Sequence, residues 1–306
     1  MKKKYCIILG DGMADEPLSE LSGMTPLEAA HTPNMDYIAR EGAMGLLKTV
    51  PDGFAPGSDI ANLSVLGYDP AECYTGRGAL EAASMGISLE GDDFAYRCNL
   101  VTIKNGILED FNAGHITSDE GALLLKTLNQ HLQGIVCHAG ISYRNLLIIP
   151  GGQGCESTPP HDITGQPFRD FLPAGPDAER LIKAMKKSHE IFMNHQVNLD
   201  RIKNAMKPAT SIWPWSGGKR PQMRSFKEMT GLSGGIISAV DLLNGIGVYA
   251  GMEIIRVPGA TGFIDTDYQA KARYAIRALE KLDFLFIHVE APDEAGHMGS
   301  IEEKVK

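Results

Sequence analysis

Two apolar segments decide the fold: Tyr5-Cys-Ile-Ile-Leu9 near the start of the sequence and Asp283-Phe-Leu-Phe-Ile-His-Val289 near its end. Each is short and nearly continuous, and Gly10-Asp11-Gly12 follows the first directly. Continuous apolar runs of this length are typical of strands buried on both faces of a parallel sheet. We therefore expect one parallel sheet that takes strands from both ends of the chain.

Helical signals lie between and beside these strands. Thr32-Pro33 favours a helix start, and the helix that it opens should end at Gly42. Ser58 favours a second helix that ends before Gly67. The stretches 234–241 and 265–282 also carry helical patterns. The sequence predicts an α/β fold with helices on both faces of a parallel sheet.

The middle of the chain has a different pattern. Segments 94–103 and 142–149 alternate like antiparallel or mixed strands, Lys104-Asn105-Gly106 favours a hairpin, and 177–193 is helical. We expect a discontinuous core domain, formed by residues 1–86 and 207–306, and an inserted smaller α/β domain at 87–206.

Composition narrows the classes of partner. The chain has 306 residues, with 29 Lys and Arg against 38 Asp and Glu, a net charge of −9. Such an acidic chain is a poor candidate for binding nucleic acid or anionic membranes through bulk charge. Its five scattered cysteines are typical of reduced thiols, and no apolar run is long enough for a membrane span. We expect a cytoplasmic protein; a homo-oligomer is left open.

Chemistry-bearing side chains follow the two strands. Asp11 comes directly after the first strand, and Asp293 and His297 come just after the second. Ligands bind at the carboxyl ends of parallel strands, and carboxylates with imidazole suit Mn, Zn, Co or Mg. Isolated Asp residues in these positions are also ordinary turn formers. Ser58 is either a helix cap or a nucleophile stabilised at a helix N-terminus.

Several motifs together resemble one known family, the archaeal-type cofactor-independent phosphoglycerate mutases of the alkaline phosphatase superfamily. The resemblance runs from Lys4 to the last residue. The motifs are Gly10-Asp11-Gly12, the stretch from Pro56 to Pro70, Thr75-Gly-Arg-Gly-Ala79, Arg97-Cys-Asn-Leu-Val-Thr102, His161-Asp-Ile-Thr-Gly165, Trp213-Pro-Trp215, Gly218-Lys-Arg-Pro221 and the stretch from His288 to His297.

The resemblance implies an alkaline-phosphatase-like core and an isomerase that interconverts 3-phosphoglycerate and 2-phosphoglycerate. Two divalent metal ions (Mn, or Mg, Co or Zn) would be bound, one by Asp11 and Ser58 and the other by Asp293 and His297. Ser58 would carry the phosphoryl group, and no 2,3-bisphosphoglycerate would be needed. The inserted domain would bind substrate through His115, Asp162, Arg77, Arg97, Arg144 and Lys219.

These substrate-binding roles have plainer alternatives. His115, implied to be the general acid/base near glycerate, is equally read as a structural histidine, and Asp162 as an Asx-turn. Arg97 and Arg144 fit ion pairs at a sheet edge, and Lys219 fits a solvated loop lysine. An Arg fork also matches the carboxylate and phosphate groups of a phosphoglycerate.

The chain departs from the family pattern near its end. The family completes its metal set with an Asp-His pair and a further His beyond the Asp-x-x-x-His motif, and none of the residues after His297 is Asp or His. A capping box, Ser300 to Glu303, also opens a helix with little body behind it. We therefore expect a C-terminally truncated chain. Phosphatase activity, phosphoryl transfer to another small acceptor such as homoserine, and an inactive fragment remain alternatives.

Overall fold

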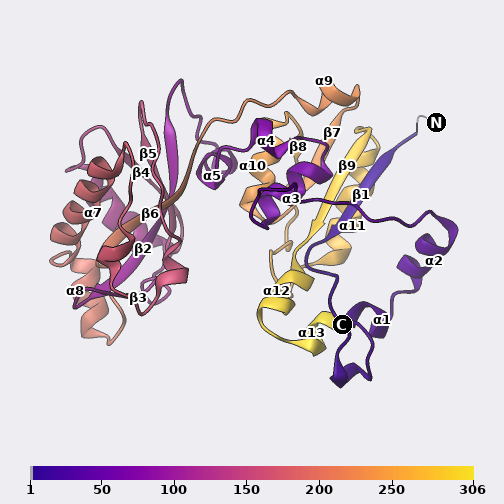
Figure 1. Cartoon of the computed structure of the whole chain (residues 1–306), viewed down its shortest axis with the longest axis horizontal. Coiled ribbons are helices and arrows are strands. Elements are labelled where there is room, and N and C mark those ends of the chain that lie inside the picture. The colour runs from indigo at the N-terminus through magenta and orange to yellow at the C-terminus, as the bar shows by residue number, and fades with distance from the viewer. Residues whose placement is uncertain (1–2) are drawn as a thin grey trace. The chain divides into compact units, whose positions relative to one another are not determined.

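The computed structural model describes residues 3–306, which divide into two compact units (Figure 1). The first unit combines the chain up to Pro70 with Met223–Lys306, and the second is Ala71–Gln222. The second unit therefore extends beyond the predicted insert, 87–206, at both ends. It includes helix α5 (Arg77–Ser84), which packs on the second unit's sheet, and β6 (Ser211–Lys219), which is a strand of that sheet.

The first unit has a parallel sheet in the order β1-β9-β7-β8. The strands are β1 (Tyr5–Gly10), β9 (Phe284–Val289), β7 (Gly234–Ile237) and β8 (Glu253–Ile254). In Figure 1 the indigo β1 lies beside the yellow β9, and their register pairs Tyr5 with Phe284 and Gly10 with Val289. The prediction of one parallel sheet built from both ends of the chain is confirmed.

The apolar sequence of β1 predicted burial on both faces, and this prediction is wrong. It is an edge strand with β9 on one side, and the Ile8 side chain is 68% exposed. The apolar run of β9, in contrast, is buried along almost its whole length. A run of apolar residues reports strand propensity but not the strand's place in the sheet, which depends on residues far away in the sequence.

Helices cover both faces of this sheet. Helix α10 (Asp241–Tyr249) packs on the face of Ile236, where its Gly247 meets that side chain. Helix α11 (Tyr268–Leu279) packs on the opposite face through Ala275 against Leu285. The other helices of the unit are η1 (Ser19–Leu21), α1 (Pro26–Ala29), α2 (Pro33–Glu41), α3 (Ser58–Val65), α9 (Phe226–Thr230), α12 (Ala291–His297) and α13 (Ile301–Val305).

The predicted helical pattern at 234–241 is wrong, because this segment contains strand β7 and the turn before α10. A four-residue apolar run between glycines fits a buried strand as well as a helix turn, and periodicity cannot separate the two. The predicted helices after Thr32, after Ser58 and within 265–282 are confirmed as α2, α3 and α11.

The second unit is a mixed α/β structure around an antiparallel sheet. β2 (Phe94–Lys104) pairs with β3 (Ile107–Asp110), β5 (Arg144–Ile149) and β6, and β4 (Val136–Ile141) pairs with β5. The predicted hairpin is confirmed, with Asn105 and Gly106 at φ 51° and 81°. The remaining helices are α4 (Pro70–Cys73), α6 (Ser118–Asn129), η2 (Pro160–Ile163), η3 (Phe168–Phe171), α7 (Ala178–Phe192) and α8 (Gln196–Lys203).

This sheet has a different layer on each face. The larger apolar core includes Leu124 of α6 and Leu181 of α7, packed with Cys98 and Leu100 of β2. The smaller core joins α5 to Ala95 of β2 and to Leu146 and Ile148 of β5. Within residues 3–306 no helix combines the length and apolarity that crossing a bilayer requires.

Candidate active site

A polar cluster lies where β1 and β9 end. His288, 1% exposed, has its Nε2 atom 3.2 Å from a carboxylate oxygen of Asp11 and 3.2 Å from one of Glu290. Asp11 follows β1, His288 belongs to β9, and Glu290 is the N-cap of α12. One ligand atom from each of these three residues lies within 4.8 Å of the others, a spacing that suits one metal ion.

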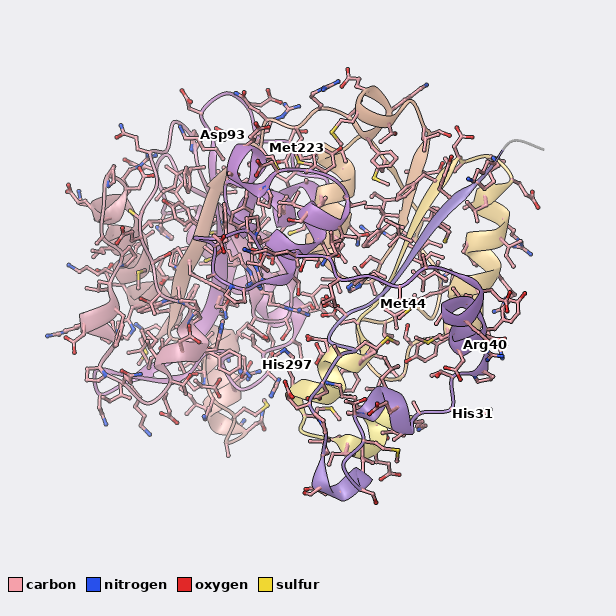
Figure 2. The ribbon with its side chains drawn as sticks, turned by 45° about the vertical axis from the view of Figure 1, so that its right-hand side comes forward. His31, Arg40, Met44, Asp93, Met223 and His297 are labelled. Carbon is pink, nitrogen blue, oxygen red and sulfur yellow. The ribbon has the colours of Figure 1, made fainter. Side chains whose placement is uncertain are left out.

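Asp293 and His297 lie on α12 beside this cluster. His297, labelled in Figure 2, has its Nε2 atom 3.2 Å from Asp293 Oδ2. Both side chains line a cavity of about 250 Å³. The Asp293 carboxylate is held against the loop after β1, because a Cβ built on Gly12 would lie 2.6 Å from Asp293 Oδ1. The structure therefore brings these two predicted ligands to the same sheet edge as Asp11.

Ser58 is the first residue of α3, and Gly57 is the N-cap. A serine at this position does not cap the helix, and its hydroxyl is instead hydrogen-bonded to the Asp11 carboxylate. The His288 hydrogen bond, together with those of Ser58 and the Gly12 backbone, holds the pKa of Asp11 below its usual value. The structure thus joins Ser58 to Asp11 while leaving the serine at a helix N-terminus, where negative charge is favoured.

Negative charge accumulates in this cluster. Burial, together with repulsion from Asp11, Asp293 and Glu294, raises the pKa of Glu290 to about 7. Lys271 of α11 lies close by, with its Nζ 3.0 Å from the backbone oxygen of His288. Burial lowers the pKa of this lysine, and the charge of Glu290 opposes that shift. Crowded carboxylates are the expected electrostatics of a cation site.

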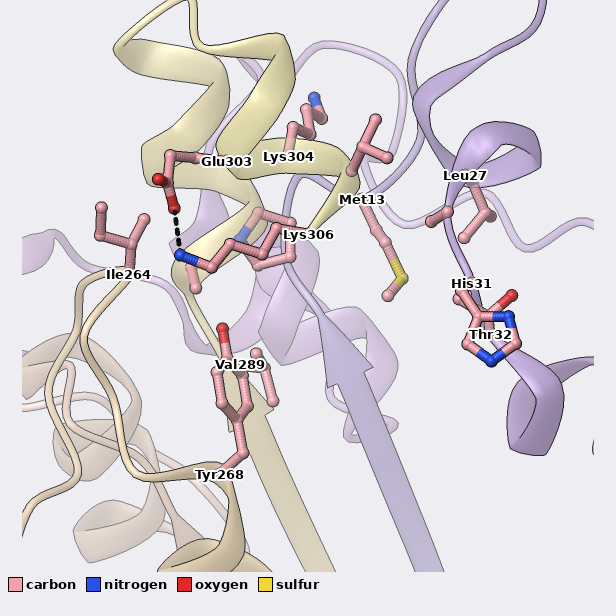
Figure 3. A pocket seen from close by; sticks show the side chains of 14 residues that line it. Met13, Leu27, His31, Thr32, Ile264, Tyr268, Val289, Glu303, Lys304 and Lys306 are labelled. Carbon is pink, nitrogen blue, oxygen red and sulfur yellow. Dashed lines mark ion pairs between the residues drawn. The ribbon is translucent and has the colours of Figure 1, made fainter.

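Figure 3 shows a second pocket in the first unit. Its lining includes Met13, Tyr268 and Val289, together with Glu303 and Lys306, whose ion pair the figure marks. Its walls are mostly apolar and contain none of the clustered carboxylates. The carboxylate cluster is therefore the better candidate for phosphoryl chemistry.

The second unit carries a group of arginines on the sheet face that α5 covers. Arg97 Nε is 2.8 Å from Glu81 of α5, and the Arg97 guanidinium stacks 4.1 Å from the centre of the Trp215 ring. Burial lowers the pKa of Arg97, and the nearby positive charges of Arg77 and Arg144 lower it further. Guanidinium groups match the geometry of carboxylate and phosphate groups, so this arginine group is a candidate for binding an anion.

The other predicted substrate residues lie elsewhere in the second unit. His115 is exposed in the loop before α6, and Asp162 is exposed in η2 with its carboxylate 3.6 Å from His161 Nε2. Lys219 ends β6 and its Nζ is 3.4 Å from Asp92. This ion pair is exposed. An edge-to-face contact between His161 and Trp215, with 5.3 Å between the ring centres, links η2 to the arginine group.

Sequence reasoning missed His288, Glu290 and Lys271 as members of the site. His288 and Glu290 are two apart at the end of a buried strand, and this spacing of polar residues was the available signal. Lys271 had no such signal, because its approach to His288 depends on how α11 packs on β9.

Comparison with known proteins shows the family of the chain. A family model described as 2,3-bisphosphoglycerate-independent phosphoglycerate mutase matches residues 39–198. A protein of that name from Methanosarcina acetivorans is 53% identical over 307 residues, which is 99% of this chain and 77% of the relative. The chain belongs to this mutase family. A probable mutase of the family from Geobacter sulfurreducens is 50% identical over a match that covers 99% of this chain and 78% of the relative's length.

Solved structures support the same family. A Pyrococcus horikoshii protein superposes with a TM-score of 0.83 at 30% identity, covering 100% of this chain and 75% of its own. The cofactor-independent phosphoglycerate mutase of Thermoplasma acidophilum has a TM-score of 0.61 at 26% identity and covers 99% of this chain and 82% of its own. The predicted family of isomerases and the predicted alkaline-phosphatase-like α/β fold are confirmed.

Proposed function

We propose that this chain interconverts 3-phosphoglycerate and 2-phosphoglycerate through a phosphorylated Ser58. The observation that carries the proposal is the placement of Ser58 at the N-terminus of α3, hydrogen-bonded to Asp11 beside a carboxylate cluster. The names of the relatives support the same reaction and describe it as independent of 2,3-bisphosphoglycerate.

The residues at the sheet edge fit divalent metal ions. Asp11, His288 and Glu290 converge, Asp293 and His297 adjoin them, and burial together with neighbouring carboxylates raises the pKa of Glu290. We propose that Asp11, Ser58, Asp293 and His297 hold two ions, Mn or else Mg, Co or Zn, and that His288 and Glu290 support them. Bound ions would lower the pKa of the serine hydroxyl and offset the phosphate charge.

The proposed reaction transfers one phosphoryl group twice. The Ser58 alkoxide attacks phosphorus, the bond from phosphorus to the glycerate oxygen breaks, and that oxygen takes a proton from protonated His115. Neutral His115 then removes the proton of the neighbouring glycerate hydroxyl. The resulting oxygen attacks the phosphoserine and restores the Ser58 alkoxide, so that protons and phosphoryl groups balance.

The second unit is proposed to bind the substrate. Arg77, Arg97 and Arg144 present guanidinium groups to its phosphate or carboxylate, and Asp162 accepts hydrogen bonds from its hydroxyls. Lys219 neutralises the transferring phosphate. Electrostatic repulsion among the three arginines supports this role, because an anion between them would relieve it.

The proposed reaction is a step of glycolysis and gluconeogenesis, for which we propose a cytoplasmic setting. All five cysteines are free thiols, as expected in a reducing compartment.

The test measures 3-phosphoglycerate conversion by ³¹P NMR with Mn²⁺ present. Ser58→Ala should abolish it, and Ser64→Ala on the same helix, whose hydroxyl donates to the Ile60 backbone oxygen, should leave it intact. Wild-type protein quenched during turnover should carry one phosphoryl group on the peptide that contains Ser58. Conversion that persists in Ser58→Ala contradicts the proposal, and release of inorganic phosphate without 2-phosphoglycerate identifies a phosphatase.

A separate readout tests the metal ligands. Mn²⁺ binding, followed by electron paramagnetic resonance, should weaken in Asp293→Asn and stay unchanged in Asp200→Asn, an exposed carboxylate of α8. Equal affinity in both variants contradicts the assignment of Asp293.

A further inference from the structure

The loop that carries His115 has an unusual backbone. It joins β3, which ends at Asp110, to α6, which begins at Ser118. Three successive residues, Ala113, Gly114 and His115, have φ angles of 50°, 62° and 51°. Residues with a side chain rarely adopt this left-handed region, yet Ala113 and His115 both do so here. Such a segment keeps its conformation only when the surrounding structure holds it.

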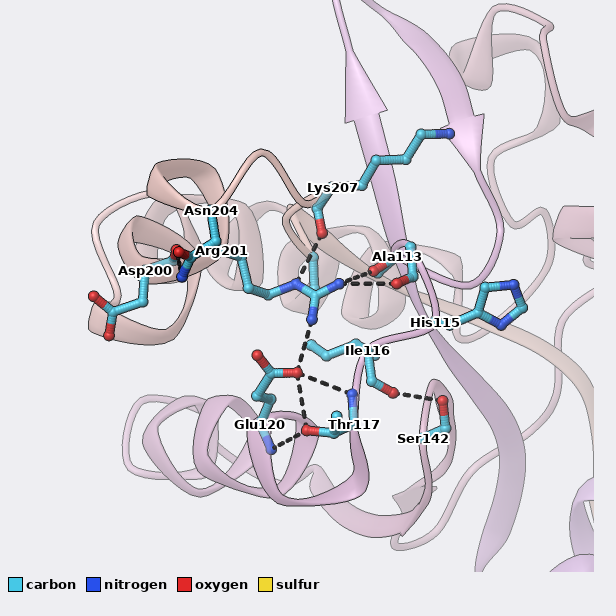
Figure 4. A network of polar contacts seen from close by, with 12 residues as sticks. Ala113, His115, Ile116, Thr117, Glu120, Ser142, Asp200, Arg201, Asn204 and Lys207 are labelled. Carbon is cyan, nitrogen blue, oxygen red and sulfur yellow. Dashed lines mark hydrogen bonds and ion pairs between the residues drawn. The ribbon is translucent and has the colours of Figure 1, made fainter.

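Arg201 of α8 holds this loop. Its side chain is 2% exposed, and its Nη2 donates to the backbone oxygens of Ala113 at 2.8 Å and Gly114 at 3.0 Å (Figure 4). Its Nε donates to the Lys207 oxygen at 2.9 Å. The guanidinium therefore bonds the carbonyl groups of the two residues that immediately precede His115.

Glu120 completes the arrangement from the other side. Arg201 Nη1 donates to Glu120 Oε2 at 2.7 Å, and the same oxygen accepts from the Thr117 backbone N–H at 3.0 Å and from its hydroxyl at 2.9 Å. Glu120 is thus the capping-box residue of α6 and the counterion of Arg201 at once. The buried guanidinium charge is compensated, and the start of α6 is tied to the loop.

The loop is also joined to the arginine group. The Phe111 backbone oxygen accepts a hydrogen bond from Asn99, whose side-chain oxygen accepts from the Trp215 indole. Trp215 in turn stacks on Arg97. In Figure 4 the His115 imidazole points away from Arg201, and His115 directly follows the two residues whose backbone oxygens the guanidinium binds. The backbone is fixed at both ends of the loop, while the imidazole remains exposed.

We propose that Arg201, with Glu120 as its counterion, is a positioning residue that sets the place of the His115 imidazole for proton transfer. This inference rests on the role proposed for His115. Arginine is required because its planar fork reaches several acceptors at once, whereas a lysine ammonium at the same place cannot match their geometry. Arg201 itself touches no substrate in this proposal.

The first test is spectroscopic and needs no catalysis. The His115 imidazole signal in a ¹H–¹³C spectrum of the whole chain is assigned by its loss in His115→Gln. It should shift or broaden in Arg201→Lys and in Glu120→Gln, while the signals of distant histidines stay in place. The control is Arg180→Lys, which also removes a guanidinium bond to a backbone oxygen, that of Gly134, but far from this loop in the sequence. It should leave the His115 signal unchanged.

The second test separates positioning from folding. Arg201→Lys should lower kcat for 3-phosphoglycerate about 10- to 100-fold with little change in KM, as expected when an acid/base group is displaced. In a His115→Gln background, Arg201→Lys should lower kcat little further, because both substitutions impair the same proton transfer. Arg180→Lys should keep the wild-type kcat.

An unchanged His115 signal in both folded Arg201→Lys and Glu120→Gln overturns the proposal. So does a kcat of the double variant that is lower by the product of the two single effects. If Arg201→Lys does not fold, the Glu120→Gln spectrum decides. Failure of the proposed function looks different: the wild type then lacks conversion, or His115→Gln keeps it, while the spectra still report whether Arg201 positions the imidazole.

Discussion

Gly12 stands at the closest approach between the loop after β1 and helix α12. Its φ of +61° lies in the left-handed region, and an added Cβ would lie 2.5 Å from the Asp293 Cα atom. The obstacle is backbone, which cannot move aside without displacing the Asp293 carboxylate. A residue with no catalytic atoms therefore controls where a proposed metal ligand lies.

Gly12→Ala should weaken Mn²⁺ binding and lower stability. The matched control is Gly53→Ala, whose φ is +90° and whose added Cβ would meet no atom within 4 Å. Both variants carry left-handed strain of roughly 1–2 kcal/mol. Only Gly12→Ala should also lower Mn²⁺ affinity, measured by electron paramagnetic resonance beside thermal unfolding. Equal Mn²⁺ affinity in the two variants would show that the contact with Asp293 is unimportant.

Arg97→Lys should raise KM for 3-phosphoglycerate by about 10- to 100-fold, the equivalent of one charged hydrogen bond. Lysine keeps the charge but loses the fork that contacts Glu81 and stacks on Trp215. Steady-state kinetics give the result, with Arg180→Lys expected to keep the wild-type KM. An unchanged KM would remove Arg97 from the substrate site.

At the scale of elements, the positions of β1 and β9 in the sheet predict unequal sensitivity. Leu285→Ala in β9 removes a fully buried side chain and should cost about 2–5 kcal/mol. Ile8→Ala on the open face of β1 should cost within about 0.5 kcal/mol. Urea unfolding of both variants measures the two costs. Similar costs would mean that Ile8 is covered in solution.

The start of α6 should show a pH signature. Burial alone would raise the pKa of Glu120, but the Thr117 hydrogen bonds and Arg201 outweigh it, so the folded pKa lies below the ordinary value. A lowered folded pKa contributes stability above the unfolded pKa of about 4.3, and this contribution disappears as pH falls through the folded pKa. The stability difference between wild type and Glu120→Gln, from urea unfolding, should be largest at neutral pH and vanish in acid. A difference independent of pH would contradict this.

Sequence patterns predicted local features well. The continuous run of β9, the Asn105–Gly106 hairpin and the helix starting after Gly57 all follow from short-range rules. The same rules missed the edge position of β1 and read β7 as helical, because strand neighbours come from distant parts of the chain. Site residues followed the same division: Asp11 was predicted at a strand end, whereas Lys271 reaches His288 only through tertiary packing.

At the scale of the whole molecule, the two units should respond to different ligands. Hydrogen exchange with Mn²⁺ should slow in peptides of the first unit that contain Ser58 or residues 284–298, because ligand binding stabilises the state that binds it. Hydrogen exchange with 3-phosphoglycerate but no metal should slow in peptides that contain Arg97 or Arg144. A chelator should reverse only the first effect. Uniform protection of both units by Mn²⁺ would contradict the separate assignments.

The pairing of β1 with β9 also sets an order of events during synthesis. About 280 residues separate the partners Tyr5 and Phe284, and the whole second unit is translated between them. At roughly 5–20 residues per second, β1 leaves the ribosome about 15–50 s before its partner strand. The second unit, continuous in sequence, is complete and able to fold in that interval. During that interval the first strand has no partner strand in its own chain, and its unpaired backbone groups are open to pairing with strands of other chains.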